Sequence, residues 1–353
     1  MTADAPSLQA SEQALLNLVQ ERFPLTVRPF RTLAEAVGLH EDAVIARLTA
    51  AREAGVLRQI SGIFDTAALG YRSSLVAMRV KPERLADAAA VISAHPGVSH
   101  NYERQHDFNL WFTIAVPPNG SLEWTVDRLS RLAGAPSARL LPALKVFKIG
   151  VSFDMTGERP ADARSEAADG ASERPESPTT PLSDLDIRVV RALQDDIALT
   201  REPFARPAAV AGVSQEALLA AAQRLESQGY MRRFAAVLHH RRAGFTANAM
   251  TVWAVPEAGA DEVGRQMASF QAVSHCYQRP AYPDWPFNLF TMIHARSSDE
   301  CEATAAAIEA ATSIHERAML YSTTEFKKVR LRYFTEELDG WEERERRSEE
   351  GLT

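Results

Sequence analysis

The sequence contains few features that would place it in a membrane, outside the cell or in a metal-binding class. No run of about 18 apolar residues occurs, which excludes the pattern of a membrane-spanning helix. Met1 to Ala10 lack the basic start and apolar core of a secretory signal. The two cysteines, Cys276 and Cys301, are too few for a disulfide framework or, by themselves, a thiolate metal site. We therefore expect a cytoplasmic protein with no membrane partner and no protein-bound metal.

Positive charge is also in short supply. The 353 residues carry a formal net charge of −7, whereas non-specific DNA binding depends on a basic face that releases phosphate counterions. Hydrophobic residues make up 46% and charged residues 24% of the chain, which is typical of a soluble globular protein. The length is sufficient for two ordinary domains with sizeable cores.

The sequence contains an internal repeat. The segment from His100 to Arg104, HNYER, returns 175 positions later as HCYQR, from His275 to Arg279. The offset has grown to 179 positions at Asn109 and Asn288, because the second copy carries a short insert around Tyr282-Pro283-Asp284-Trp285-Pro286. Between the copies, residues 156–181 are rich in Pro, Ser, Ala, Gly and charge, and predict a flexible tether.

Each copy begins with a helical part. Ser183 to Asp186 and Thr32 to Glu35 both have capping-box spacing and predict helix starts, the second helix ending near Gly38. A further helix is expected from Glu41 to Glu53, followed by a strand pair or wing from Val56 to Phe64. Three helices and a wing are typical of a winged helix-turn-helix.

The second part of each copy alternates between strands and helices. The order of the expected elements is β-α-β-β-α-β, which is the ferredoxin-like arrangement. In the first copy the last strand is expected from Leu144 to Phe153, and in the second from Thr323 to Phe334. The predicted fold is thus α+β, a tandem repeat of winged helix-turn-helix and ferredoxin-like domains. The expected segments are winged helices at 1–66 and 182–240, ferredoxin-like domains at 67–155 and 241–340, the tether at 156–181 and a polar tail at 341–353.

This domain order resembles the leucine-responsive (Lrp/AsnC) regulators, over nearly everything except the tether and tail. Three local motifs resemble more closely the enzymatic branch of that family, the siroheme decarboxylases, in a form whose two subunits are fused. They are the Pro-Arg-Phe insert of Phe23 to Phe30, mirrored by Ala198 to Phe204, the segment from His100 to Thr113, and the segment from His275 to Leu289. The resemblance implies removal of two acetate carboxyls from siroheme to give 12,18-didecarboxysiroheme, on the route to heme d1 or in an alternative heme route. It implies no cofactor, because the substrate carries the iron.

The repeated motif can supply the groups that this chemistry needs. Side chains spaced by two share one face of a strand, so His100, Tyr102, Arg104 and His106 should form one row and His275, Tyr277 and Arg279 another. Arginine binds carboxylates through paired charge-assisted hydrogen bonds, and histidine can return a proton to carbon near neutral pH. The predicted catalytic residues are His100, His106, His240 and His275. The predicted substrate-binding residues are Arg28, Arg104, Arg201, Arg241, Arg279, Tyr102, Tyr277, Tyr282, Trp111, Trp285 and Asn288.

Plainer interpretations remain open for several of these residues. A strand histidine is often structural, the tryptophans divide between core and pocket wall, and Asn109 and Asn288 could simply satisfy a turn. Cys276 is expected to be a small buried residue. Because His239-His240-Arg241 and the aromatic insert belong to the second copy, the sequence favours that copy for the main pocket.

Two other functions compete. One is a DNA-binding regulator, but the two stretches in the position of a recognition helix, His40 to Glu53 and Ser214 to Gln228, lack the Lys, Arg, Asn and Gln surplus of a base-reading helix. We therefore expect no DNA partner. The other is a heme-binding protein without catalysis, which would need the same clamps. The two copies are expected to pair within the chain as a pseudo-dimer, and a further homodimer remains open.

Overall fold

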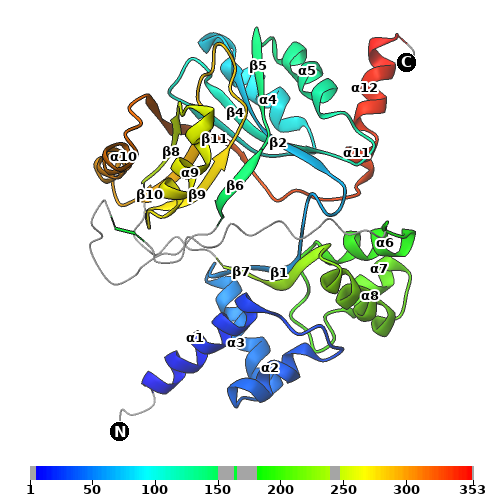
Figure 1. The fold of residues 1–353 in the computed structure, drawn as a ribbon. Coiled ribbons are helices and arrows are strands. Elements are labelled where there is room, and N and C mark those ends of the chain that lie inside the picture. The colour runs from blue at the N-terminus through cyan, green and yellow to red at the C-terminus, as the bar shows by residue number, and fades with distance from the viewer. Residues whose placement is uncertain (1–4, 150–162, 165–180, 239–246, 352–353) are drawn as a thin grey trace. The chain divides into compact units, whose positions relative to one another are not determined.

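The computed structural model describes residues 5–149, 163–164, 181–238 and 247–351, which form two compact units. The helical unit comprises residues 1–71, 175–240 and 332–336, and the sheet unit comprises residues 72–174, 241–331 and 337–353 (Figure 1). Each unit combines corresponding parts of both copies. Within the described residues, no helix is both long and apolar enough to cross a bilayer.

The helical unit contains the two helix-turn-helix segments. The first copy supplies α1 (Ala5–Glu21), α2 (Pro29–Val37), α3 (Glu41–Glu53) and β1 (Leu57–Phe64), and the second supplies α6 (Asp184–Leu193), α7 (Ala205–Ala211), α8 (Gln215–Ser227) and β7 (Met231–Leu238). β1 and β7 pair antiparallel with each other, with Gly62 opposite Phe234. The predicted strand pair within one copy is therefore wrong, because each wing is a single strand whose partner comes from the other copy.

Of the two capping boxes predicted from the sequence, only one forms at a helix start. At α6, Ser183 and Asp186 form the predicted capping box. At α2, Thr32 does not cap the helix, which begins three residues earlier at Pro29. Proline suits the first helical position, since its missing N–H would have no partner there and its φ is already helical. The helix ends as predicted at Gly38, whose φ of 67° is open to glycine without steric cost.

The sheet unit contains two ferredoxin-like halves. The first consists of β2 (Arg72–Arg79), η1 (Pro82–Arg84), α4 (Leu85–Ala94), β3 (Val98–Arg104), β4 (Leu110–Val116), α5 (Leu122–Ala133), β5 (Ser137–Leu141) and β6 (Lys145–Ile149). The second consists of β8 (Ala247–Trp253), η2 (Glu257–Gly259), α9 (Ala260–Ala268), β9 (Val273–Gln278), β10 (Leu289–Ala295), α10 (Ser298–Thr312) and β11 (Arg317–Lys328). The strands form one sheet in the order β5-β2-β4-β3-β11-β8-β10-β9-β6. The predicted tandem α+β fold is confirmed.

The last strand of each copy is shared between the halves. β11 pairs with β8 of its own copy through Arg317 to Tyr321, and then with β3 of the first copy through Ser322 to Lys328. In the first copy the same path is broken at Pro142 into β5, which pairs with β2, and β6, which pairs with β9. The predicted strand over 144–153 therefore missed β5. The predicted strand over 323–334 began too late and ended too late.

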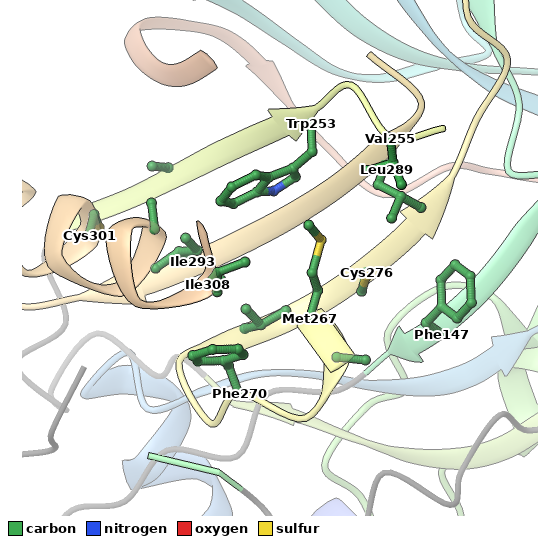
Figure 2. Packing of buried hydrophobic residues seen from close by; sticks show 14 of the residues in the cluster. Phe147, Trp253, Val255, Met267, Phe270, Cys276, Leu289, Ile293, Cys301 and Ile308 are labelled. Carbon is green, nitrogen blue, oxygen red and sulfur yellow. The ribbon is translucent and has the colours of Figure 1, made fainter. Parts of the chain in front are cut away.

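The cores lie between the helices and one face of the sheet. In the second copy, Cys276 and Cys301 are buried beside Trp253 and Met267, as Figure 2 shows. Phe147 of β6 enters this core from the first copy, against Gly264, where an added Cβ would lie 2.4 Å from the phenyl ring. The exchanged strand is thus held by side-chain packing as well as by backbone pairing. Burial raises the pKa of Cys276 to about 12, so the residue is the small buried thiol that was predicted.

The polar tail is ordered for most of its length. After α11 (Glu336–Asp339), α12 spans Trp341–Glu349, so the tail forms a helix within the sheet unit. Glu342 accepts a hydrogen bond from the Ser121 backbone N–H at 2.6 Å, and Glu345 and Glu349 pair with Arg128 at 2.8 and 3.0 Å. Ion pairs with α5 therefore hold a sequence with little to bury.

Candidate active site

The two His-Tyr-Arg rows lie on the face of the sheet turned away from the helices. Their neighbours point the other way: Asn101 donates to Ala89 O of α4 at 3.1 Å, and Cys276 lies in the helix-side core. Alternation along each strand then places His100, Tyr102 and Arg104 of β3, and likewise the row of β9, on the opposite face. The spacing by two in the sequence predicted this sharing of a face.

The two rows make equivalent contacts. His100 Nδ1 lies 3.0 Å from Ser99 Oγ, and His275 Nδ1 lies 2.8 Å from Ser274 Oγ. In both rows the imidazole stacks on the tyrosine ring, with centroids 6.1 Å apart. The repeat thus preserves a geometry as well as a set of residue types. Burial lowers the pKa of His275, so this imidazole is neutral near pH 7.

The arginines at the ends of the rows are a buried cation, Arg104, and a partly buried one, Arg279. Arg104 is 6% exposed and donates through Nη1 to Leu320 O at 2.6 Å, and Arg279 donates in the same way to Leu141 O. Burial lowers the pKa of each guanidinium to about 10, so both remain charged at pH 7. Among the residues that the structure describes, neither pairs with a carboxylate. Burying a charge that has no acid partner is costly, and a bound anion would offset that cost.

Unsatisfied hydrogen-bond donors collect on this same face. Within the described residues, the buried Nε atoms of Arg79, Arg104 and Arg279 and the indole Nε1 of Trp285 have no hydrogen-bond partner. Each is an N–H donor without acceptor capacity. A ligand that satisfies this face therefore has to bring acceptors, and carboxylate oxygens match both the donors and the charge.

An aromatic cluster covers the centre of the face. Trp285 is fully buried and makes edge contacts with His106 and Trp111, each at 5.2 Å between ring centroids. Trp111 donates to Phe108 O at 2.6 Å, and His106 Nδ1 accepts from the Phe108 N–H at 3.0 Å. Burial lowers the pKa of His106, Asp107 raises it and Arg79 lowers it. The cluster partly shields from water an imidazole that is neutral near pH 7.

The aromatic insert of the second copy packs on the first copy. The Tyr282 hydroxyl donates to Leu140 O at 2.6 Å, and Asp284 pairs with Arg139 at 2.7 Å. Trp285 contacts His106 and Phe108 of the first copy as well as Phe287 of its own. The insert therefore contributes to the first copy's side of the face, although its place in the sequence favoured the second.

Several predicted residues lie elsewhere or have other contacts. Arg28 and Arg201 belong to the helical unit, where they pair with Glu41 and Asp42 and lower the pKa of each carboxylate. Asn288 uses its amide on the backbone N–H and C=O of Val255, at 2.9 and 2.8 Å, which is the structural role left open by the sequence. His240 and Arg241 lie outside the described residues.

Sequence reasoning missed Arg79, Ser137, Arg139 and Glu325, all of which belong to the sheet unit. Arg79 ends a strand that was predicted, and it shares a face with Leu75 and Ala77 by simple alternation, so the signal was present. Ser137 and Arg139 lie on β5, which was not predicted. Glu325 faces Tyr102 across the pairing of β11 with β3, a contact that no local pattern indicates.

Comparison with known proteins matches nearly the whole chain. Residues 12–58 and 186–232 match the siroheme decarboxylase NirDL-like HTH domain, and residues 68–148 and 242–327 match the AsnC-like ligand binding domain. A siroheme decarboxylase of Hydrogenobacter thermophilus is 41% identical over 93% of this chain and 96% of its own length.

Two solved structures of the siroheme decarboxylase NirDL are also similar. One matches with a TM-score of 0.78 at 35% identity, covering 96% of this chain and 99% of the other. The second, in co-complex with an iron-uroporphyrin III analogue, matches with a TM-score of 0.77 at 34% identity, covering 97% and 100%. The chain belongs to the siroheme decarboxylase family.

Proposed function

We propose that this protein decarboxylates siroheme, removing two acetate carboxyls to give 12,18-didecarboxysiroheme on the route to heme d1 or in an alternative heme route. The observation that carries this proposal is the excess of N–H donors on one face of the sheet, with two arginines whose Nε atoms are buried and that have no acid partner among the described residues. Relatives named siroheme decarboxylase support it, as does a related structure that contains an iron-uroporphyrin III analogue.

The reaction is a carbon–carbon bond cleavage without a net redox change. The bond between the acetate methylene and its carboxylate breaks, carbon dioxide leaves, and the electron pair stays on the methylene carbon. That carbon then takes up a proton and becomes a methyl group. In this proposal the protein is a carboxy-lyase, and the iron enters with the substrate instead of being held as a separate cofactor.

The proposed site residues have three roles: they bind carboxylates, exclude water or donate a proton. Arg104 and Arg279 anchor carboxylates that do not react, and the phenols of Tyr102 and Tyr277 donate hydrogen bonds beside them. Trp111, Trp285 and Tyr282 exclude water, which removes solvation from the scissile carboxylate.

Histidine supplies the proton. Burial keeps His106 and His275 neutral near pH 7 in the free protein. A bound polyanion favours the charged imidazolium and so raises the pKa of each histidine. In this proposal the histidine is protonated, and can donate its proton, only when substrate is bound. His100 and His240 are further candidates for the proton donor.

The test is anaerobic incubation of the purified protein with siroheme, with the products followed by absorption and mass spectrometry. We expect two successive losses of carbon dioxide from the wild type and a loss of most activity in His106→Ala or His275→Ala. His315→Ala, at an exposed position of the same unit, is the matched control. Full activity in both histidine variants would contradict the histidine assignment, and an inactive wild type that binds siroheme would overturn the function.

A further inference from the structure

Arg79 and Ser137 face each other at one end of the sheet. Arg79 is the last residue of β2 and Ser137 the first of β5, and the two are directly paired in the antiparallel register. Side chains that are directly opposite lie on the same face of a sheet, with Cβ atoms about 5 Å apart. Leu75 and Ala77 of β2 belong to the cluster on the face away from the helices, so alternation places Arg79 and Ser137 on the face of the His-Tyr-Arg rows.

Both of these side chains have unmet hydrogen-bonding capacity. Arg79 Nε and Ser137 Oγ are buried, and neither has a partner among the described residues. The Arg79 guanidinium lies over the Phe108 ring, 4.8 Å from its centroid. By contrast, Arg139, two residues along β5 from Ser137, is paired through two hydrogen bonds with Asp284. Arg79 and Ser137 therefore offer donors at the same place, together with a positive charge that acts on Asp284 electrostatically but forms no ion pair among the described residues.

The second copy has no such pair. The equivalent positions, just after β8 and just before β11, are occupied by Ala254 and Glu316, which are joined by a backbone hydrogen bond of 2.9 Å. Ala254 has no donor in its side chain, and Glu316 is an exposed carboxylate where the first copy has a hydroxyl. One end of the pseudo-symmetric face thus attracts a carboxylate, and the corresponding position at the other end repels it.

We propose that Arg79 and Ser137 form a carboxylate-binding subsite that fixes which way round the macrocycle lies on the face. This inference rests on the proposed function. The two rows are so alike that a polycarboxylate ring could bind in two orientations related by the pseudo-symmetry. A donor pair at one end and a carboxylate at the other make those orientations unequal in free energy. The subsite holds a carboxylate that is not removed, and thereby decides which acetate groups lie beside the histidines.

Binding is measured first, with iron uroporphyrin III as the probe in absorption titrations. We expect affinity to fall roughly tenfold or more in Arg79→Gln and several-fold in Ser137→Ala, since a charge-assisted hydrogen bond contributes more than a neutral one. Lys81→Gln is the matched control, because it removes an exposed positive charge two residues further along the chain and should leave affinity unchanged.

A second titration uses iron coproporphyrin III, which has propionates but no acetates. A loss of affinity for both porphyrins assigns a propionate to the subsite, and a loss for iron uroporphyrin III alone assigns an acetate. Unchanged affinity in Arg79→Gln for both porphyrins overturns the proposal.

Orientation is read from products. With siroheme, we expect Arg79→Gln to give a changed ratio of singly decarboxylated isomers on chromatography. Ala254→Arg combined with Glu316→Ser copies the subsite to the other end and should increase the minor isomer further. An isomer ratio identical to wild type in both variants refutes the orienting role. Failure of the proposed function is distinguishable, because in that case the wild type itself releases no carbon dioxide.

Discussion

Two lines of paired residues cross the face of the sheet turned away from the helices, one through each His-Tyr-Arg row. Through the first copy's row the line runs Glu325, Tyr102, Trp111, Ala77, Arg139, and through the second copy's row Val146, Tyr277, Phe290, Val252, Ala318. The first residue of each line comes from the exchanged strand of the other copy. The centres agree, since each has a tyrosine beside an aromatic ring. The residues at the two ends of each line differ. The first line ends in the acidic Glu325 and the basic Arg139, whereas the second ends in the apolar Val146 and Ala318.

The two copies therefore have similar residue types at the centre of each line and different ones at its ends. Burial, together with Glu325, raises the pKa of Tyr102 to about 12, so this phenol stays a hydrogen-bond donor. Tyr277 has Val146 in the place of Glu325 and the Arg279 guanidinium at 4.9 Å from its ring. The two copies therefore offer the same anchors in different electrostatic surroundings, and the variants below separate what is shared from what is not.

The largest effect is expected from the anchors that the copies share. Arg104→Met and Arg279→Met should each weaken binding of iron uroporphyrin III by roughly a hundredfold, because two charge-assisted hydrogen bonds contribute about 3 kcal/mol together. Absorption titration measures this. Stability should change little, since each variant removes a largely desolvated charge without an acid partner and loses one charge-assisted hydrogen bond to a carbonyl, worth about 1.5 kcal/mol.

A purely structural role for these arginines gives the opposite pattern. In that case both variants would lose several kcal/mol in urea unfolding, and porphyrin affinity would follow stability. The two copies are compared directly, because a much larger effect of one arginine identifies the copy that holds the substrate more firmly.

The next effect concerns a buried histidine that only one copy has. His95 of the first copy corresponds to Phe270 of the second, and burial lowers the pKa of His95 to about 3. Below pH 6.5 the unfolded chain binds a proton that the folded chain refuses, so stability falls as the pH falls. His95→Phe should remove on the order of 2 kcal/mol of the loss between pH 6.5 and pH 5, measured by urea unfolding at both values.

The slope with pH is the diagnostic quantity, because the substitution also removes the hydrogen bond that His95 accepts from the Gly97 N–H. His40→Phe, at an exposed position, is the control. An unchanged slope in His95→Phe would assign the acid sensitivity to other groups. Since His95 packs against Trp341 at 4.3 Å, release of α12 should accompany the acid transition.

A smaller effect is expected from the pH dependence of binding. The pKa values of His106 and His275 are lowered in the free protein, and a polyanionic ligand favours their protonated forms. Affinity should therefore rise as the pH falls from 8 to 6, by at most tenfold per unit for each proton taken up. Arg79 and Asp107 also act on His106, so titrations of His106→Gln and His275→Gln show which copy takes up the proton. A flat profile in the wild type would mean that neither histidine charges on binding.

The smallest effect concerns the ion pair at one end of the first line. Asp284→Asn frees Arg139 and removes a carboxylate that repels the ligand, so affinity should rise two- to fivefold, in keeping with a partly exposed pair. Glu262→Gln, which breaks the exposed pair with Arg265, is the control. A drop in affinity in Asp284→Asn would show that the pair is needed to position the insert.

Much of the fold could be predicted because its signals are local. Alternation along β3 and β9 fixed the shared face of each row, and the capping box at Ser183 marked a helix start. The repeat itself disclosed two equivalent halves. These signals depend on neighbouring residues and are therefore readable in the chain.

The rest depends on partners that are distant in sequence. Lys327 donates to Ser93 O and His95 O at 2.7 and 3.0 Å, just as Lys148 donates to Phe270 O at 2.8 Å. Each lysine lies on the exchanged strand and donates to backbone carbonyls at or just after the end of a helix of the other copy. Nothing in the local pattern indicates such an exchange, and for the same reason Arg79 and Ser137 could not be paired before the sheet was known.

The crossing of β6 and β11 has a consequence for how the two copies can evolve. If the copies were separate, interchangeable chains, two identical copies could associate. Some assemblies would then have Arg79 and Ser137, which attract a carboxylate, at both ends of the face, and others would have Ala254 and Glu316 at both ends. Covalent fusion gives each last strand a nearby partner of the other kind at high effective concentration. Every molecule then carries one end of each type, so a substitution in one copy need not be tolerated by an identical neighbour.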